Sequence, residues 1–143
     1  MKGRWQMETI QYRFSKEIDK DQVISLYEDA GWTSYTKDPE KLMKALYHSL
    51  MVISAWDNER LVGLIRVVGD GLVILYIQDI LVLNDYKRKG IGKILMNYIF
   101  SKYKEVRQKV LLTEDSKETR GFYESMGFKS CDDGITVAFA IQE

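Results

Sequence analysis

The chain has 143 residues, with 21 basic and 21 acidic side chains and therefore no net charge. This length suits one domain with its own core, and the balanced charge argues against a nucleic-acid-binding protein. A single cysteine, Cys131, excludes an internal disulfide, and with one histidine it argues against a metal site. Gln78 and Asp79 interrupt the longest apolar run, and no signal core precedes it. We expect a soluble, cytoplasmic protein without a membrane partner.

Hydrophobic periodicity and turn residues divide the chain into alternating strands and helices. The expected elements are a strand at 10–14, helices beginning after 19 and 38, strands at about 51–56, 61–68 and 72–83, a helix from 90 to about 103, a strand at 109–113, a helix at 116–126, and a closing pair of strands at 128–130 and 135–141. This order predicts an α/β fold with a mixed, mostly antiparallel sheet of about seven strands flanked by four helices. We expect residues 7–143 to form a single domain, with residues 1–6 as a leader before a second start at Met7.

The most informative segment is the basic, glycine-rich stretch from Tyr86 to Lys93, which follows an apolar strand and opens a helix. Unpaired N–H groups and the positive end of the helix dipole favour phosphate at such a point. Gly90 and Gly92 let a phosphate approach the main chain without a Cβ in the way. The segment therefore predicts a site for a phosphorylated cofactor, and an ordinary solvated run of charges is the alternative. The expected binding residues are Lys87, Arg88, Lys89, Gly90, Ile91, Gly92 and Lys93.

Two common phosphate motifs do not fit this loop. A dinucleotide fingerprint needs glycine at position 95, which is Leu95, and an acidic residue near position 110, which is Val110. A P-loop needs Ser or Thr after its lysine, whereas Ile94 follows Lys93. The loop instead resembles the pyrophosphate loop of the GNAT-type N-acetyltransferases, Gln/Arg-x-x-Gly-x-Gly/Ala, with Lys87 at the first position.

A second segment, residues 116–128, resembles the family's Asn-x-x-Ala-x-x-x-Tyr-x-x-x-Gly-Phe motif. Three residues match in register: Tyr123, Gly127 and Phe128. Ser116 replaces the usual Asn, and Thr119 replaces the usual Ala. The strand before the glycine loop is also similar to the family's lead-in, with Asn84 in place of a proline. Two motifs at the correct separation, together with the element order, identify the chain as a member of the GNAT superfamily.

The resemblance implies acetyl-CoA as co-substrate in a cleft beside the strand at 72–83. Its pantetheine arm would pair with the backbone of Ile80, Leu81 and Val82, and its pyrophosphate would bind residues 88–93. Ser116 and Tyr123 complete the implied cofactor contacts. The implied reaction is direct acetyl transfer to a primary amine of a small molecule or, as the less favoured acceptor, of a protein. Because Asn84, Lys87 and Ser116 depart from the residues usual in the family's motifs, a non-catalytic acyl-CoA sensor is the alternative. Because dimers are common in this family, the resemblance also suggests a homodimer.

Each candidate catalytic residue has a second interpretation. Tyr123 is either the acid that protonates the departing thiolate or a packing residue. Aspartate is a residue type that is depleted in strands, so Asp79 is unusual within an apolar strand. It is either a general base or a group that orients the amine, or it is a hydrogen-bonded structural carboxylate at a strand distortion. We favour the structural interpretation. His48 is a weaker candidate base, and Cys131 is incidental.

The acceptor site is the part that the sequence describes least. In the GNAT fold the acceptor pocket lies by the first two helices, where Trp32 and Tyr35 provide aromatic side chains for an aromatic or aliphatic amine. The favoured alternative is that these rings pack the helices against the sheet.

Overall fold

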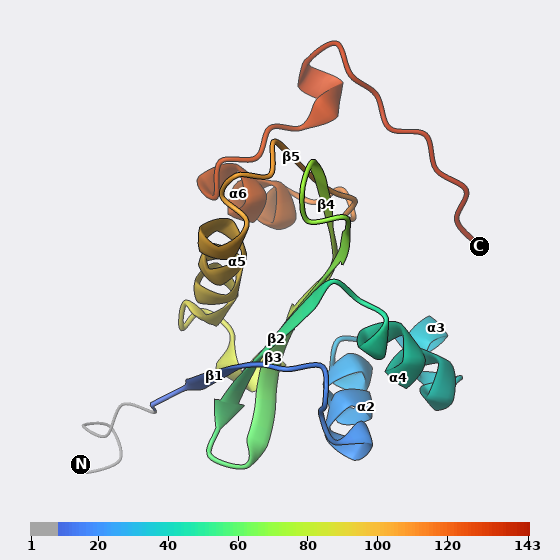
Figure 1. Cartoon of the computed structure of the whole chain (residues 1–143), viewed down its shortest axis with the longest axis vertical. Coiled ribbons are helices and arrows are strands. Elements are labelled where there is room, and N and C mark those ends of the chain that lie inside the picture. The colour runs from blue at the N-terminus through green and yellow to red at the C-terminus, as the bar shows by residue number, and fades with distance from the viewer. Residues whose placement is uncertain (1–8) are drawn as a thin grey trace. The chain divides into compact units, whose positions relative to one another are not determined.

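The computed structural model describes residues 9–143. The predicted leader, residues 1–6, and the second start at Met7 lie outside the described residues. The chain divides into two compact units, the first ending at Leu111 and the second beginning at Leu112. The first unit contains the whole sheet and most of the helices (Figure 1).

The sheet has five strands whose spatial order is their order in the chain. They are β1 (Gln11–Phe14), β2 (Met51–Asp57), β3 (Arg60–Gly69), β4 (Ile74–Val82) and β5 (Gln108–Leu111). The first four strands pair antiparallel, whereas β5 pairs with β4 in parallel. A parallel neighbour requires a crossover connection, and α5 (Ile91–Lys102) provides it. The predicted α/β class with a mixed, mostly antiparallel sheet is confirmed.

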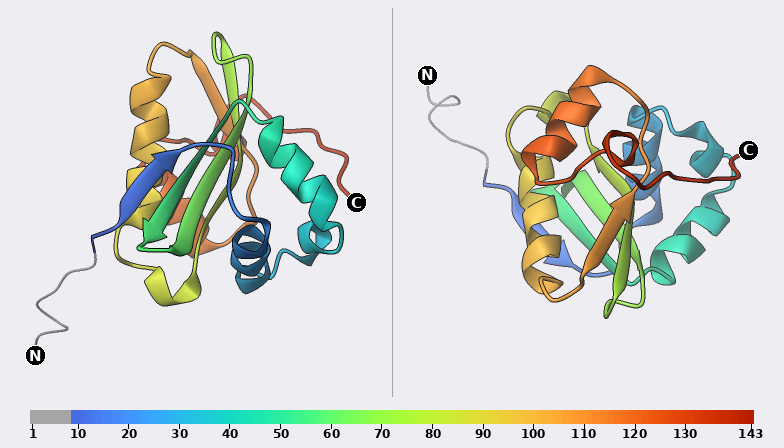
Figure 2. Two further views of the ribbon diagram at one scale, coloured as in Figure 1. Left: turned by 60° about the horizontal axis from the view of Figure 1, so that its bottom comes forward. Right: turned by 90° about the horizontal axis from the view of Figure 1, so that it is seen from above.

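Helices cover both faces of this sheet (Figure 2). One face carries α2 (Lys20–Asp29), α3 (Thr33–Thr36) and α4 (Pro39–Tyr47), and the other carries α5. The α5 side is marked by Gly63 on β3, where an added Cβ would lie 3.2 Å from Ile91. The short helix α3 is absent from the predicted elements because four residues are too few to show a period.

The predicted starts of the first two long helices, after residues 19 and 38, are confirmed, and an aspartate caps each helix. The Asp19 side chain accepts the N–H of Gln22 at 3.1 Å, and the Asp38 side chain accepts the N–H of Lys41 at 3.2 Å. Each bond satisfies a backbone donor that the helix itself leaves unpaired. The chain's local signals therefore define where α2 and α4 begin.

The second unit contains α6 (Lys117–Ser125) and a 3₁₀ turn, η2 (Cys131–Asp133). The Arg120 guanidinium holds this unit together, with 2.6 Å to Asp115 and 3.0 Å to Asp132. In the part of the chain that the structure describes, no helix has the length and apolar character needed to span a membrane.

The predicted closing pair of strands, at 128–130 and 135–141, is wrong, and the sheet has five strands rather than about seven. Ile135, Val137, Phe139 and Ile141 do alternate with smaller residues, but their side chains are 66–103% exposed. Alternation reports the preference of a segment for a pleated surface, whereas a strand forms only against a partner. The pattern alone does not identify that partner.

Candidate active site

The start of α5 presents backbone donors to open space. Gly90 caps the helix in a left-handed conformation, with φ of 84°, and no side chain bonds to this end. The first bond within the helix runs from the N–H of Ile94 to the carbonyl of Gly90, at 3.0 Å. The N–H groups of Ile91, Gly92 and Lys93 therefore have no acceptor within the helix. A Cβ added at Gly90 would meet no atom within 4 Å, so an anion can approach here.

The basic side chains predicted to surround this point are all exposed: Lys87, Arg88, Lys89 and Lys93. Arg88 also has a left-handed backbone, with φ of 67°. Tyr86, which is buried beneath the loop, donates its hydroxyl hydrogen to Asp57, and its ring lies 5.5 Å from the Lys89 Nζ. The loop is thus anchored to the sheet from below while its charges face outward.

Asn84 has a structural role that the family comparison by sequence did not reveal. Its backbone N–H donates to Asp29 Oδ2 at 2.7 Å, and its side-chain amide donates to the Asp29 carbonyl at 3.1 Å. A proline at this position could not make the first bond, because it has no N–H. The departure from the family's pattern therefore ties the cofactor loop to the end of α2.

The end of β4 is open along one side. β5 pairs with β4 only from Ile74 to Ile77, whereas β3 continues to pair with Ile80, Leu81 and Val82. In the described sheet these three predicted cofactor contacts therefore have a strand neighbour on one side alone. An extended chain could add to that edge through main-chain hydrogen bonds.

A β-bulge lies just before this open edge. Arg66 pairs with Asp79 and the next residue of β3, Val67, pairs with Ile77, so Gln78 is an extra residue on β4. Bulges re-aim the side chains beside them. This one turns Asp79 to the face that carries α2 and α3, opposite Arg66.

Asp79 is buried within a network of donors. Its Oδ2 accepts from Arg66 Nε at 2.8 Å and from the Tyr27 hydroxyl at 2.9 Å, and its Oδ1 accepts from the Tyr35 hydroxyl at 2.7 Å. The side chains of Asp79 and Arg66 are 2% and 8% exposed. The arrangement is that of a structural carboxylate at a strand distortion, one of the two interpretations of Asp79 from the sequence.

The ionisation of this network follows from burial and from Asp79. Burial raises the pKa of both Tyr27 and Tyr35, and the nearby carboxylate raises each further, so both phenols keep their protons. Burial lowers the pKa of Arg66, but the attraction of Asp79 outweighs it, and the pKa lies above its ordinary value. The network is therefore a charged pair with two neutral donors.

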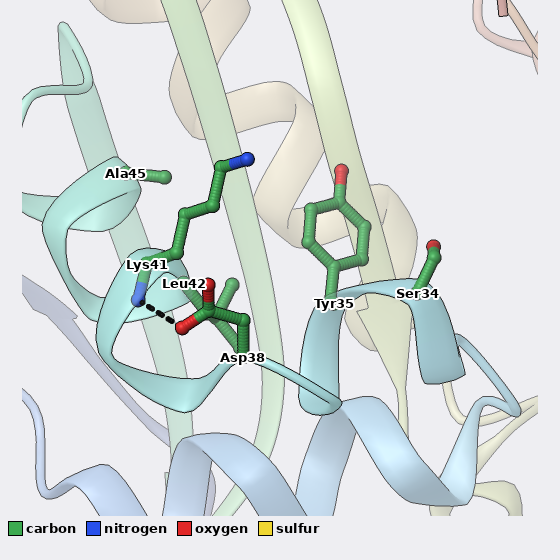
Figure 3. A pocket seen from close by; sticks show the side chains of 6 residues that line it. All are labelled: Ser34, Tyr35, Asp38, Lys41, Leu42 and Ala45. Carbon is green, nitrogen blue, oxygen red and sulfur yellow. Dashed lines mark hydrogen bonds between the residues drawn. The ribbon is translucent and has the colours of Figure 1, made fainter. Parts of the chain in front are cut away.

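Tyr35 also lines a hollow of about 240 Å³ between α3 and α4. The hollow is lined by Ser34, Tyr35, Asp38, Lys41, Leu42 and Ala45. The Tyr35 hydroxyl and the Lys41 side chain point to the same side of it (Figure 3). The Trp32 ring lies 6.1 Å from that of Tyr35 and 5.9 Å from that of Tyr27. The two predicted acceptor residues, Trp32 and Tyr35, are thus brought together and joined to Asp79.

Two further predicted site residues belong to the second unit. Ser116 caps α6 by accepting the N–H of Thr119 at 3.1 Å. Tyr123 is half-buried, and burial raises the pKa of its phenol despite an opposing hydrogen bond with Thr113. Its ring contacts Phe122 and Phe128, with centroids 5.1 and 5.8 Å away. The weaker candidates, His48 and Cys131, are both exposed.

Sequence reasoning missed Arg66, the partner of Asp79. Arg66 was visible as a lone charge in an apolar strand, the same signal that singled out Asp79. Opposite charges in two adjacent apolar strands indicate a buried pair, because an unpaired buried charge is costly.

Comparison with known proteins identifies the family. Residues 14–138 match the family model described as "Acetyltransferase (GNAT) domain". The chain therefore belongs to the GNAT acetyltransferase family, and the fold and family predicted from its two motifs are confirmed.

Relatives with names or structures agree with this assignment. The "Uncharacterized N-acetyltransferase ycf52" of Porphyra purpurea is 27% identical over 130 residues, covering 87% of this chain and 73% of that protein. A GNAT-family acetyltransferase from Streptococcus pneumoniae has a TM-score of 0.84 at 36% identity, covering 94% of this chain and 98% of that one. AAC(6')-Iy in complex with the bisubstrate analogue CoA-S-monomethyl-acetylneamine has a TM-score of 0.66 at 15% identity, covering 94% and 99%, a likeness of fold alone. The chain is an acyltransferase of the N-acetyltransferase class.

Proposed function

We propose that this enzyme transfers the acetyl group of acetyl-CoA directly to a primary amine of a small molecule. The observation that carries the proposal is the arrangement at the end of β4. There, an open strand edge at Ile80–Val82 leads into a basic loop and the uncapped start of α5. An extended arm followed by a pyrophosphate needs these two features in this order.

The residues divide the binding of acetyl-CoA between them. The main chain of Ile80–Val82 pairs with the pantetheine arm, and the N–H groups at the start of α5 bind the pyrophosphate. Lys87, Arg88, Lys89 and Lys93 add positive charge, and Ser116 contributes from the second conserved motif of the family. When bound, the co-substrate supplies an acyl thioester that an amine can attack.

The reaction also needs a neutral amine and a proton for the departing thiolate. A primary amine with an ordinary pKa near 10.4 is only about 0.04% neutral at pH 7, so desolvation at the site must favour the neutral form. A backbone N–H near Ile80–Val82 stabilises the developing oxyanion. Tyr123 holds its proton at neutral pH, because burial raises the pKa of the phenol, and it donates that proton to the sulfur as the C–S bond breaks.

The acceptor binds beside Trp32 and Tyr35. Tyr35 lines a hollow of about 240 Å³, and the ring of Trp32 lies 6.1 Å from that of Tyr35. This volume is just below the lower limit of about 300 Å³ for ligand pockets, which favours an acceptor of small size. AAC(6')-Iy, whose fold is similar to that of this chain, was solved with the bisubstrate analogue CoA-S-monomethyl-acetylneamine. Small amines are therefore the first acceptors to test.

The test is release of free CoA thiol from acetyl-CoA with aromatic amines, polyamines, aminoglycosides, amino acids and peptides. Turnover with a small amine supports the proposal. Turnover with peptides alone would contradict the acceptor class, and acetyl-CoA binding without thiol release would favour the sensor alternative.

The role of Tyr123 is tested with Tyr123→Phe. We expect kcat to fall by about 100-fold or more, the usual contribution of a general acid, while the Kd for acetyl-CoA measured by calorimetry stays the same. Tyr98→Phe, on the exposed side of α5, is the matched control and should keep full activity. Full activity in Tyr123→Phe would remove the role.

A further inference from the structure

The Asp79–Arg66 pair is a buried, charged group to which the reaction as proposed assigns no necessary step. Replacing a buried ion pair by apolar residues of similar size often leaves the stability of a fold unchanged or raises it. Stabilisation of the fold alone is therefore a weak explanation for this pair. The pair also lies at the one irregular point of β4, directly before the open edge at Ile80–Val82. Its position calls for a different explanation.

The donors around Asp79 come from three different elements. Arg66 belongs to β3, Tyr27 to the middle of α2, and Tyr35 to α3. Arg66 is further held by the Ser49 hydroxyl, at 3.4 Å from its Nη1. One carboxylate on β4 therefore fixes the positions of two helices and a neighbouring strand.

The helix α3 depends on this network for its placement. It has only four residues, contains no buried side chain, and has no side-chain cap at its start. A helix of this length does not persist by its own hydrogen bonds. Its ties to the sheet run through the Tyr35 hydroxyl, which donates to Asp79 at 2.7 Å and accepts from Gln78 and Arg66 at 3.1 and 3.5 Å. The rings of Trp32 and Tyr35 contact Tyr27 of α2.

The Tyr35 hydroxyl therefore joins the wall of the hollow to the bulge of β4. It donates to Asp79 and accepts from Gln78, the extra residue of the bulge. The bulge is followed by the strand edge to which we assign the pantetheine arm. The Tyr35 hydroxyl is thus a direct link between the acceptor wall and the strand that carries the proposed cofactor edge.

We propose that Asp79, paired with Arg66, is a positioning residue that holds the acceptor wall, through Tyr35, in register with the cofactor edge of β4. This inference rests on the proposed function for its kinetic consequence. It assigns Asp79 no proton transfer. A binding surface that is already held in place spares the acceptor the cost of ordering it, so loss of this link is expected to raise the KM for the acceptor.

The first test is Tyr35→Phe, which keeps the ring and removes only the hydroxyl. We expect the KM for the acceptor to rise about 5- to 10-fold, as for a lost hydrogen bond to a charged group, with the KM for acetyl-CoA unchanged. Tyr98→Phe is again the matched control. An unchanged acceptor KM, or a change confined to acetyl-CoA, would overturn the proposal.

The second test separates positioning from general-base catalysis. Because Asp79→Asn leaves Arg66 buried without its charge partner and can fail to fold, we pair it with Asp79→Leu/Arg66→Met, which removes both charges together. We expect the folded double variant to keep kcat within a few fold and to keep the acidic limb of its pH profile, while its acceptor KM stays raised. Loss of kcat by about 100-fold or more, with loss of that limb, would make Asp79 a base and overturn the proposal.

A third readout does not need turnover. Hydrogen exchange of the amides at 33–38 should be faster in Tyr35→Phe and in the double variant, while exchange in β3 is unchanged. Absence of thiol release by the wild type would contradict the proposed function and leave this measurement intact. Unchanged exchange at 33–38 would overturn the positioning role even in an active enzyme.

Discussion

Two parts of the chain gather backbone N–H groups around one point, and they differ in what occupies that point. In the turn between β3 and β4, Asp70 Oδ1 accepts from the N–H groups of Leu72, Val73 and Ile74, at 2.8, 2.9 and 3.1 Å. At the start of α5 no side chain takes the equivalent place, since Gly90 caps the helix. The chain supplies its own anion where the turn is structural and leaves the donors available where we expect a phosphate.

The longer helices sharpen this contrast. α2, α4 and α6 each begin at a residue whose side chain accepts a backbone N–H, namely Asp19, Asp38 and Ser116. Among the described helices of nine or more residues, α5 lacks such a cap. A glycine in place of a capping side chain costs only a few tenths of a kcal/mol, and an external anion can satisfy the same donors.

The largest expected effect comes from supplying α5 with its own anion. In Gly90→Asp a carboxylate would compete with the pyrophosphate for the same donors, and a side chain would enter a left-handed position. We expect the KM for acetyl-CoA to rise about 10- to 100-fold with the acceptor KM little changed. Gly90→Ala reports the backbone strain alone and should show a smaller rise. Wild-type affinity in Gly90→Asp would refute the assignment of the pyrophosphate to this point.

A smaller effect is expected from Asp70→Ala, which removes the carboxylate that the three N–H groups of the β3–β4 turn bind. The three N–H bonds lower the pKa of Asp70 from its ordinary value of 3.8. A lowered pKa in the folded state stabilises the fold fully above pH 3.8, and this contribution disappears as the pH falls through the folded-state pKa.

Urea unfolding at pH 7, 5 and 3 measures this contribution. We expect the free energy of unfolding of the wild type to exceed that of Asp70→Ala by the same amount at pH 7 and pH 5, and by a smaller amount at pH 3. Asp133→Ala, another exposed carboxylate, is the control. A difference in the free energy of unfolding that grows at low pH would contradict a lowered pKa for Asp70.

The smallest effect concerns charge alone. In Lys93→Gln the backbone donors remain and one exposed charge is lost, so the KM for acetyl-CoA should rise only a few fold at low salt. The difference should vanish at high salt, where exposed charges are screened. Lys104→Gln, an exposed lysine of the α5–β5 connection, should behave as wild type. A salt-independent loss in Lys93→Gln would indicate a direct structural role for its side chain.

The features that the sequence predicted are local ones. The helix starts after Asp19 and Asp38 and the strand–loop–helix unit all depend on residues within a few positions of one another. The family motifs added the position of the cofactor edge, which no periodicity in the chain would have indicated.

The features that it missed depend on pairing between distant segments. Beside the turn Gly69 pairs with Leu75, and this register would place Arg66 opposite Gln78 if it continued unbroken. The single extra residue of the bulge places Arg66 opposite Asp79 instead. A shift of one residue exchanges the two faces of a strand. The sequence indicated a strand distortion at Asp79, but not the register that the bulge creates or the partner, Arg66, that it supplies. In the same way, the pattern of the closing strands did not identify a strand for them to pair with.

The strand order of the sheet also has a consequence for how the chain folds. From β1 to β4 each strand lies beside its neighbour, and β2, β3 and β4 are joined by tight turns, so little loop entropy is lost when they pair. β5 reaches β4 across the loop at the start of α5 and α5 itself, and β1 reaches β2 across α2, α3 and α4. These two pairings span far more of the chain than the two hairpins do, and they are the slower ones to form. The loop that we assign to the pyrophosphate thus lies in one of the two long connections of the sheet, and an anion that binds its N–H groups would favour the closing of that connection.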